Sequence, residues 1–234
     1  MTTDVSAGVG IDRLFGAGAH FAQVKSRRHP SMKSFLVGTK ARVEIIDLAQ
    51  TDAQLREAKK AMTAMAEAGK TVLFVGGKRE VSDAVKAAAS RIGAPYVASR
   101  WLGGTITNFT QIKKRIDRLA DLLAKRESGE LAKLYTKLER IHIDREIDRL
   151  ILRLDGITTL EKRPDAFVIV DTKREVHATR EARAAGIPVI GIMSSDCDLA
   201  DAAYPIVMND ASREAVRLVL SELASAYEMG RKGV

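Results

Sequence analysis

Cysteine is almost absent from this sequence, and long apolar runs are missing. A single cysteine among 234 residues excludes a disulfide framework and a zinc site built from several cysteines. No apolar run approaches the roughly 20 residues that a membrane-spanning helix needs. The N-terminal stretch carries Asp4 and Asp12 and has no apolar core of signal-peptide length. We therefore expect no membrane partner and a reducing, cytosol-like compartment.

Positive charge is in excess and unevenly distributed. The chain has 38 Lys and Arg against 30 Asp and Glu, which gives a net charge of +8 and a pI near 9.6. Residues 1–40 and 110–154 each carry an excess of four positive charges, so the rest of the chain is close to neutral. Such a surplus favours a polyanionic partner such as nucleic acid, although solubility alone also explains it. The apolar fraction of 46% excludes a wholly disordered chain.

Short apolar runs alternate with helix-forming stretches over most of the chain. The pattern predicts strands over 43–48, 71–76, 96–98, 166–171, 187–193 and 204–207, and helices over 52–68, 80–92, 174–185 and 211–229. Thr51, with Gln54 three residues later, has the form of a capping box at the start of the first of these helices. Apolar strands that alternate with helices are typical of a parallel sheet covered by helices on both faces. We therefore predict an α/β fold.

The segment 110–155 has a helical periodicity instead. Apolar residues recur every three or four positions over 110–127, and Ser128-Gly129 interrupts the pattern. A second apolar stripe consists of Leu131, Leu134, Leu138 and Ile141, and after a phase shift of Ile143, Ile147, Leu150 and Leu154. This pattern predicts an antiparallel coiled-coil helical hairpin. Because its other faces are densely charged, we expect the hairpin to project as an arm; the alternative is that it folds back onto the sheet.

The stretch RWLGGTITNF, which starts at Arg100, combines the single tryptophan of the chain with two glycines and three small polar side chains. The glycines allow the backbone to approach a partner closely, and Thr105, Thr107 and Asn108 are of the kind that contact phosphate and sugar. Arg100 adds positive charge beside an aromatic ring. The alternative is a structural loop in which Trp101 packs into the core and Asn108 caps the next helix. Both interpretations stay open on local chemistry.

The segment QVKSRRHPSMKSF, residues 23–35, is basic and lacks a regular period. This composition suits an arm that lies along a nucleic-acid backbone, because its cations can neutralise phosphates. A solvated tail is the alternative.

Signatures of catalysis and of nucleotide binding are absent or incomplete. FVGGKRE, residues 74–80, has the Gly-Gly-Lys of a phosphate loop, but it lacks the upstream glycine and has Arg79 where a Ser or Thr would bind magnesium. No nucleophile can be paired with a general base. Asp196, Cys197 and Asp198 make at most a partial metal site. We therefore predict no enzyme activity, no cofactor, no metal and no small-molecule substrate.

Seven segments of the chain resemble, in order, the small-subunit ribosomal protein S-two family of bacteria and organelles. They are GAHFAQ (18–23), HPSMK (29–33), VEIIDLAQT (43–51), LFVGGKRE (73–80), RWLGGTITNF (100–109), RPDAFVIVD (163–171) and EARAAGIPVIGI (181–192). The resemblance covers about residues 9–229, and WLGGTITN ahead of a helical hairpin is highly specific to that family. It implies a flavodoxin-like parallel sheet interrupted by the coiled-coil hairpin, without catalytic activity. It also implies contact with small-subunit rRNA and other small-subunit ribosomal proteins, including docking of the first small-subunit protein, which recruits messenger RNA.

The pattern along the chain, its basic stretches and the resemblance together divide the chain and select candidate residues. We predict a basic N-terminal arm with a first helix (1–42), a first α/β part (43–109), the hairpin (110–155) and a second α/β part (156–230). The predicted RNA-binding residues are Lys25, Arg27, Arg28, Lys33, Lys78, Arg100, Trp101, Thr105, Thr107, Asn108, Lys113, Lys114 and Arg115. The expected location is the small ribosomal subunit, in a cytoplasm or in an organelle stroma or matrix.

Two other functions are compatible with the same residues. A flavodoxin-like nucleotide-binding enzyme, with the hairpin as a dimerisation arm, predicts a pocket beyond the strand ends near Asp47, Gly76 and Asp171. Without paired partners, the two aspartates are better explained as helix-capping or turn residues. A coiled-coil adaptor that does not bind RNA predicts little salt dependence in any RNA association.

Overall fold

The computed structural model describes residues 9–232 of the chain, so Asp4 and the first eight positions of the predicted N-terminal segment lie outside the described residues. Within this range, no helix combines the length and the apolar character that crossing a bilayer requires.

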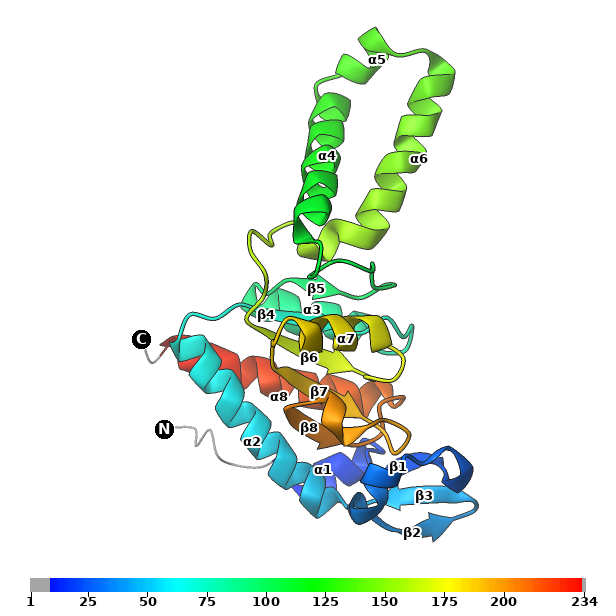
Figure 1. Ribbon diagram of the computed structural model, residues 1–234, viewed down its shortest axis with the longest axis vertical. Coiled ribbons are helices and arrows are strands. Elements are labelled where there is room, and N and C mark those ends of the chain that lie inside the picture. The colour runs from blue at the N-terminus through cyan, green and yellow to red at the C-terminus, as the bar shows by residue number, and fades with distance from the viewer. Residues whose placement is uncertain (1–8, 233–234) are drawn as a thin grey trace.

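A parallel sheet of five strands forms the centre of the molecule (Figure 1). Its strand order is β5-β4-β6-β7-β8 and every neighbouring pair is parallel, as the alternating pattern predicts. The strands are β4 (Val72–Val75), β5 (Tyr96–Val97), β6 (Ala166–Val170), β7 (Val189–Met193) and β8 (Tyr204–Val207). All residues of β4, β6 and β7 are buried, which explains why these strands are continuous apolar runs rather than alternating ones.

Helices cover both faces of this sheet, and successive strand residues point to opposite faces. Side chains such as Phe74 and Val168 pack under α2 (Leu48–Glu67), α3 (Ser82–Ile92) and α8 (Arg213–Lys232). Their neighbours Leu73 and Phe167 pack on the other face, under α7 (Val176–Ala184) and the base of the hairpin. Because α3 and α7 lie on opposite faces, the chain changes direction between β4 and β6, which makes that point the topological switch of the sheet.

A second, smaller sheet holds the N-terminal segment and corrects the prediction for residues 43–48. The strand β3 (Val43–Ile46) does not join the parallel sheet; it pairs antiparallel with β1 (Phe21–Val24) and β2 (Leu36–Lys40). Ile46 and Met32 pack against Met193 and Val207 of the large sheet. An apolar run shows that a strand is buried, but its pairing partner is set by the tertiary neighbours, and β1 and β2 are too short and polar to be recognised in the sequence.

The basic segment 23–35 is therefore folded rather than an extended arm. After β1 it forms two 3-10 helices, η1 (Lys25–Arg27) and η2 (Pro30–Phe35), before β2 begins. The short helix α1 (Ile11–Gly16) precedes this unit, and the 3-10 helices η3 (Asp155–Ile157) and η4 (Leu199–Asp201) lie later in the chain. The buried Met32 anchors η2 to the core, which explains how a polar segment is held in place.

The start of α2 differs from the predicted capping box. The cap is Asp47, whose carboxylate accepts a hydrogen bond from the backbone N–H of Ala49 at 3.0 Å. Thr51 lies inside the helix, and its hydroxyl donates to the carbonyl of Val207 at 2.6 Å. The side chain of Gln54 accepts a bond from the N–H of Val207 at 2.9 Å. The two predicted capping residues therefore attach α2 to β8.

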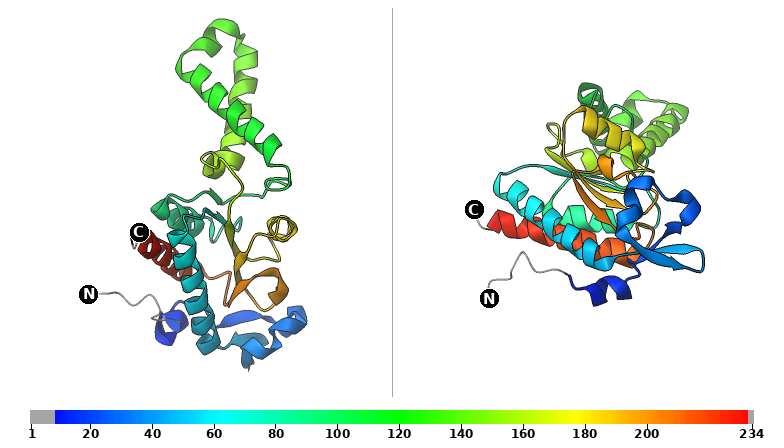
Figure 2. Two further views of the ribbon diagram at one scale, coloured as in Figure 1. Left: turned by 60° about the vertical axis from the view of Figure 1, so that its left-hand side comes forward. Right: turned by 60° about the horizontal axis from the view of Figure 1, so that its bottom comes forward.

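The hairpin projects from the end of the body opposite the small sheet (Figures 1 and 2). It consists of α4 (Phe109–Glu127), α5 (Glu130–Leu134) and α6 (Lys137–Leu154), and α4 packs antiparallel against α6 and α5. This confirms the projecting arm. The second half of the arm is interrupted, because Thr136 and Glu139 form a capping box that restarts the helix at Lys137.

This restart also corrects the predicted apolar seam of the arm. Leu134, Leu138 and Ile141 are 64%, 66% and 41% exposed, whereas Ile147 and Leu154 are buried. The interruption at Tyr135 and Thr136 sets a new helical phase, so the stripe that starts at Leu131 does not continue into the packed side of α6.

Candidate nucleic-acid interface

The loop between β5 and α4 is held by one carboxylate. Glu181 on α7 accepts hydrogen bonds from the indole N–H of Trp101 at 3.0 Å and from the backbone N–H of Gly104 at 2.7 Å on one oxygen. Its other oxygen accepts from the backbone N–H groups of Ile106 at 2.9 Å and Thr107 at 3.3 Å. Four donors that would be costly to leave unpaired are thereby satisfied, so the loop has a defined shape.

These bonds shift the acidity of the carboxylate. Burial opposes ionisation of Glu181, but the bonds from Trp101, Ile106, Gly104 and Thr107 outweigh it, so the pKa of Glu181 lies below its ordinary value. The ionised form is the one that accepts all of these bonds. Sequence reasoning missed Glu181, because no local signal connects it to a loop more than 70 positions away.

The loop divides its predicted RNA-binding residues into two groups. Trp101 is buried against Phe167, and Thr105 is buried with its hydroxyl donating to the carbonyl of Leu102. These two side chains therefore have a structural role in the loop. Arg100, Thr107 and Asn108 are exposed. Asn108 occupies the cap position of α4, but its side chain makes no capping bond.

Lys78 lies in a buried ion-pair cluster rather than on the surface. Its ammonium is 2.6 Å from the carboxylate of Asp171 and 3.1 Å from that of Asp210, and 12% of the side chain is exposed. Burial lowers the pKa of Lys78, but the two carboxylates outweigh it and raise the pKa above its ordinary value. The ammonium is therefore directed at protein carboxylates.

The same cluster contains three potential metal ligands. Asp171, Cys197 and Asp210 are buried, and their ligand atoms lie within 4.8 Å of one another. Burial and the charge of Asp171 raise the pKa of the Cys197 thiol to about 12, so the thiol is protonated at neutral pH in this arrangement. Lys78 already supplies positive charge between the two aspartates. The adjacent residues Asp196, Cys197 and Asp198, which the sequence offered as a partial metal site, do not form one. Asp196 pairs with Lys173 at 3.0 Å, and Asp198 caps η4.

Some, but not all, of the predicted RNA-binding cations of the N-terminal unit are exposed to solvent. Lys25, Arg27 and Lys33 are exposed, and we call them the N-terminal patch. Arg28 is different: its guanidinium lies 2.9 Å from the carboxylate of Glu44, which is 2% exposed. Because a buried carboxylate needs a partner, Arg28 compensates the charge of Glu44.

The base of the arm presents a second set of cations. Lys114 and Arg115 are exposed, and Lys113 is half-buried with its ammonium 3.9 Å from Asp117. Arg115 lines a cavity of about 250 Å³ together with Arg149 and Arg153 of α6, which the predictions did not include. Their spacing of four residues on one helix is the signal that could have identified them. We call Arg100, Lys114 and Arg115 the arm-base patch. Figure 1 shows that α4 starts at the opposite end of the body from β1–β3, the small sheet beside the N-terminal patch.

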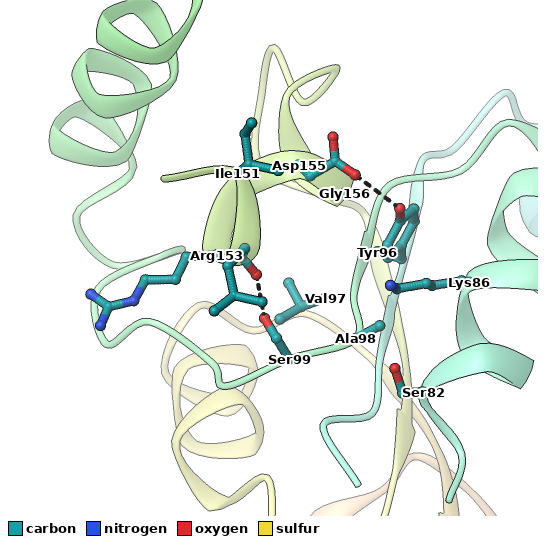
Figure 3. A pocket seen from close by; sticks show the side chains of 11 residues that line it. Ser82, Lys86, Tyr96, Val97, Ala98, Ser99, Ile151, Arg153, Asp155 and Gly156 are labelled. Carbon is teal, nitrogen blue, oxygen red and sulfur yellow. Dashed lines mark hydrogen bonds between the residues drawn. The ribbon is translucent and has the colours of Figure 1, made fainter. Parts of the chain in front are cut away.

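The junction between arm and body is a pocket of about 280 Å³ (Figure 3). The Tyr96 hydroxyl bonds to the carboxylate of Asp155 at 3.4 Å, and the Ser99 hydroxyl donates to the carbonyl of Leu152 at 2.9 Å. Gly156 packs so closely on Tyr96 that a Cβ there would clash with its backbone oxygen. These contacts fix the direction of the arm.

Asp47, Gly76 and Asp171 do not form the pocket that the enzyme hypothesis predicts. Asp47 caps α2 beside the small sheet, and Asp171 binds Lys78. A Cβ on Gly76 would lie 2.8 Å from Val85, so this position is enclosed in the core.

Comparison with known proteins gives a consistent result. A family model described as "Ribosomal protein S2" matches residues 14–230. The chain is 39% identical over 225 residues to "Small ribosomal subunit protein uS2" of Coprothermobacter proteolyticus, which covers 96% of this chain and 84% of the relative. It is 40% identical to the protein of that name from Crocosphaera subtropica, with 96% and 83% covered. It is 39% identical to "Small ribosomal subunit protein uS2c" of Rhodomonas salina, with 96% and 92% covered.

Proposed function

The chain belongs to the ribosomal protein S2 family, whose members are structural and not enzymatic, and from this premise we propose that it is a component of the small ribosomal subunit that binds rRNA through its two exposed basic patches. The observation that carries the proposal is that the predicted RNA-binding cations fall into two classes, those exposed to solvent and those paired with buried carboxylates. Those of the N-terminal patch and the arm-base patch are exposed, while Lys78 and Arg28 are paired with buried carboxylates. The nucleotide-binding enzyme is not retained.

Two patches at opposite ends of the body suit a large folded RNA better than a short linear one. A-form RNA is recognised mainly by its shape and its phosphates, and contacts spread over a surface provide this. Each patch has exposed Lys or Arg side chains that can neutralise phosphates. The proposed location follows from the relatives: a bacterial cytoplasm or a plastid, within the small subunit.

The N-terminal unit also supports the proposed docking of the first small-subunit protein. Phe15 and Phe21 are 60% and 46% exposed. The ring of His20 stacks on Phe15 at 4.3 Å and contacts Phe21 at 4.0 Å. Exposed aromatic clusters of this kind are typical of protein interfaces. We propose that this cluster contacts a neighbouring small-subunit protein, while the basic patches contact RNA.

The test reverses three charges of the arm base: Lys113→Glu, Lys114→Glu and Arg115→Glu together. We expect the variant to fold normally and to leave small subunits at lower salt than the wild type during sedimentation, because phosphate contacts are lost. A control with the same charge change elsewhere, Lys60→Glu, Lys70→Glu and Lys162→Glu, should sediment like the wild type, since these exposed residues lie outside both patches. Equal salt resistance of both variants would contradict the arm-base assignment.

A further inference from the structure

A crevice of about 290 Å³ opens at the carboxyl ends of the parallel strands. It is lined by Gly77, Arg100, Trp101, Arg174, Glu175 and His177. Gly77 follows β4, and Arg174 and Glu175 follow β6, so the crevice lies at the topological switch between these strands. Ligands of open α/β sheets bind at this place, and the volume is at the lower end of the roughly 300–1,000 Å³ of small-ligand sites.

The rim of the crevice is positive. Arg100 and Arg174 are exposed, and neither side chain makes a hydrogen bond or ion pair within residues 9–232. Arg174 acts on Glu175 only through its charge, so the N–H donors of both guanidinium groups can bind a phosphate at this opening.

The floor of the crevice is a buried carboxylate. Glu175 is 7% exposed, and one of its oxygens accepts a hydrogen bond from the backbone N–H of Gly77 at 3.0 Å. The other oxygen has no hydrogen-bond partner among the described residues, so it remains available to a ligand that donates N–H groups. A simple anion would be repelled there, which argues against inorganic phosphate as the complete ligand.

The rest of the crevice wall suits a planar group that would lie between the two arginines and Glu175. The exposed ring of His177 and the guanidinium planes of the two arginines are surfaces on which a nucleobase can stack. Guanine presents adjacent N1–H and N2–H donors, which match an acceptor-only carboxylate, whereas the corresponding edge of adenine carries an acceptor. In a duplex that edge is occupied by pairing, so the base must be unpaired.

We propose that this crevice binds one unstacked guanine nucleotide of RNA, with its phosphate at Arg100 and Arg174 and its base edge at Glu175. The inference deepens the proposed function and rests on it, since the RNA is the one that the basic patches bind. It assigns Arg174, Glu175 and His177 to RNA binding, which the sequence did not predict.

The test uses the full-length protein and two labelled single-stranded heptamers, one with seven adenines and one with a central guanine, followed by fluorescence anisotropy. We expect the guanine-containing heptamer to bind about tenfold more tightly, within the range of a good bidentate base contact. Glu175→Gln should abolish this preference, because an amide presents N–H groups to the guanine donors, yet its carbonyl can still accept from Gly77.

Arg174→Gln should weaken both heptamers alike and lower the salt slope of binding by about 0.7, as expected for one lost phosphate contact to a single strand. Arg180→Gln is the matched control, because Arg180 is an exposed arginine on α7, a few positions after Arg174, but does not line the crevice, and it should bind both heptamers like the wild type. GMP in competition distinguishes the source of the nucleotide: displacement only at much higher concentration than the heptamer supports RNA, and equal affinity overturns the assignment to RNA.

Equal binding of the two heptamers by the wild type, or an unchanged preference in Glu175→Gln, would overturn the guanine site. This failure is distinguishable from failure of the proposed function. Sedimentation of the wild type with small subunits stands whatever the heptamers show, whereas a chain that never associates with small subunits contradicts the proposed function itself.

Discussion

Basic side chains at the base of the arm and Lys78 at the strand-end edge of the sheet lie in opposite environments. Lys114 and Arg115 lie in solvent on a helix that projects from the body, while the ammonium of Lys78 lies between two buried carboxylates. Water compensates the exposed charges at little cost, whereas a buried charge requires a partner of opposite sign. Lys114 and Arg115 are therefore available to an external phosphate, whereas Lys78 contributes to folding.

The two regions also differ in how far apart their contacting residues are in the chain. In the arm, Thr136 and Glu139 form a capping box across three positions. At the strand-end edge, Glu181 binds Gly104 across 77 positions. Local contacts of the first kind form wherever the sequence allows, and long-range contacts exist only once the sheet has brought the segments together. Four variants test this contrast.

The largest effect is expected from Lys78→Met. This change keeps the side-chain stem but leaves Asp171 and Asp210 as buried carboxylates without their cation, so the free energy of unfolding should fall by about 3–5 kcal/mol. Urea denaturation measures this change. Lys114→Met at the arm base is the control and should stay within about 0.5 kcal/mol of the wild type. A similarly small change in the free energy of unfolding for both variants would show that Asp171 and Asp210 do not depend on Lys78 for charge compensation.

Glu181→Ala should cost roughly 1–3 kcal/mol, because the loop donors lose their acceptor. Since Trp101 is the single tryptophan, its fluorescence reports the loop directly and should shift toward that of exposed indole. Glu127→Ala, on the exposed surface of the arm, should change neither stability nor fluorescence. An unchanged emission spectrum in Glu181→Ala would contradict the role of this carboxylate.

The pH dependence of Glu181 gives a smaller effect with a defined sign. Because its pKa is lowered in the folded state, its contribution is complete above the unfolded pKa of about 4.3 and is lost as the pH falls through the folded pKa. The stability difference between wild type and Glu181→Gln should therefore shrink between pH 7 and pH 3 in a series of denaturation curves. A difference that stays constant over this pH range would show that Glu181 has an ordinary pKa.

Leu138→Ser should have the smallest effect. With 66% of Leu138 exposed, the structure predicts a change within about 0.5 kcal/mol, whereas a residue in the packed seam would cost much more. Ile147→Ala on the same helix provides the comparison, since this fully buried side chain should cost about 2–5 kcal/mol. An equal loss in the free energy of unfolding for the two variants would show that Leu138 belongs to the packed seam, as the apolar spacing predicts.

Much of the fold could be predicted because its signals are local. The parallel strands are uninterrupted apolar runs, and the helices between them are rich in good helix formers. The small sheet could not be predicted, because β3 looks like one more buried strand and its partners β1 and β2 have no pattern of their own. The phase of the arm was also misjudged, because a single capping box at Thr136 resets it.

The candidate interface was predicted as a list of residue types rather than as a surface. Exposed members such as Lys25 and Lys114 cannot be separated in the sequence from Lys78, whose carboxylate partners are distant in the chain. Arg174 and Glu175 received no assignment, because only the switch between β4 and β6 places them beside Arg100. Their roles in RNA binding remain predictions for the experiments above.

The sequence by itself determined the α/β class, the projecting arm and the family, since these depend on periodicity, propensity and short motifs that neighbouring residues carry together. Only the tertiary structure decided which cations are paired with buried carboxylates, which face the solvent, and which carboxylate holds the loop after β5. The physical reason is that a charge is compensated by whatever lies within a few ångströms of it, and folding, not the order of residues, determines those neighbours.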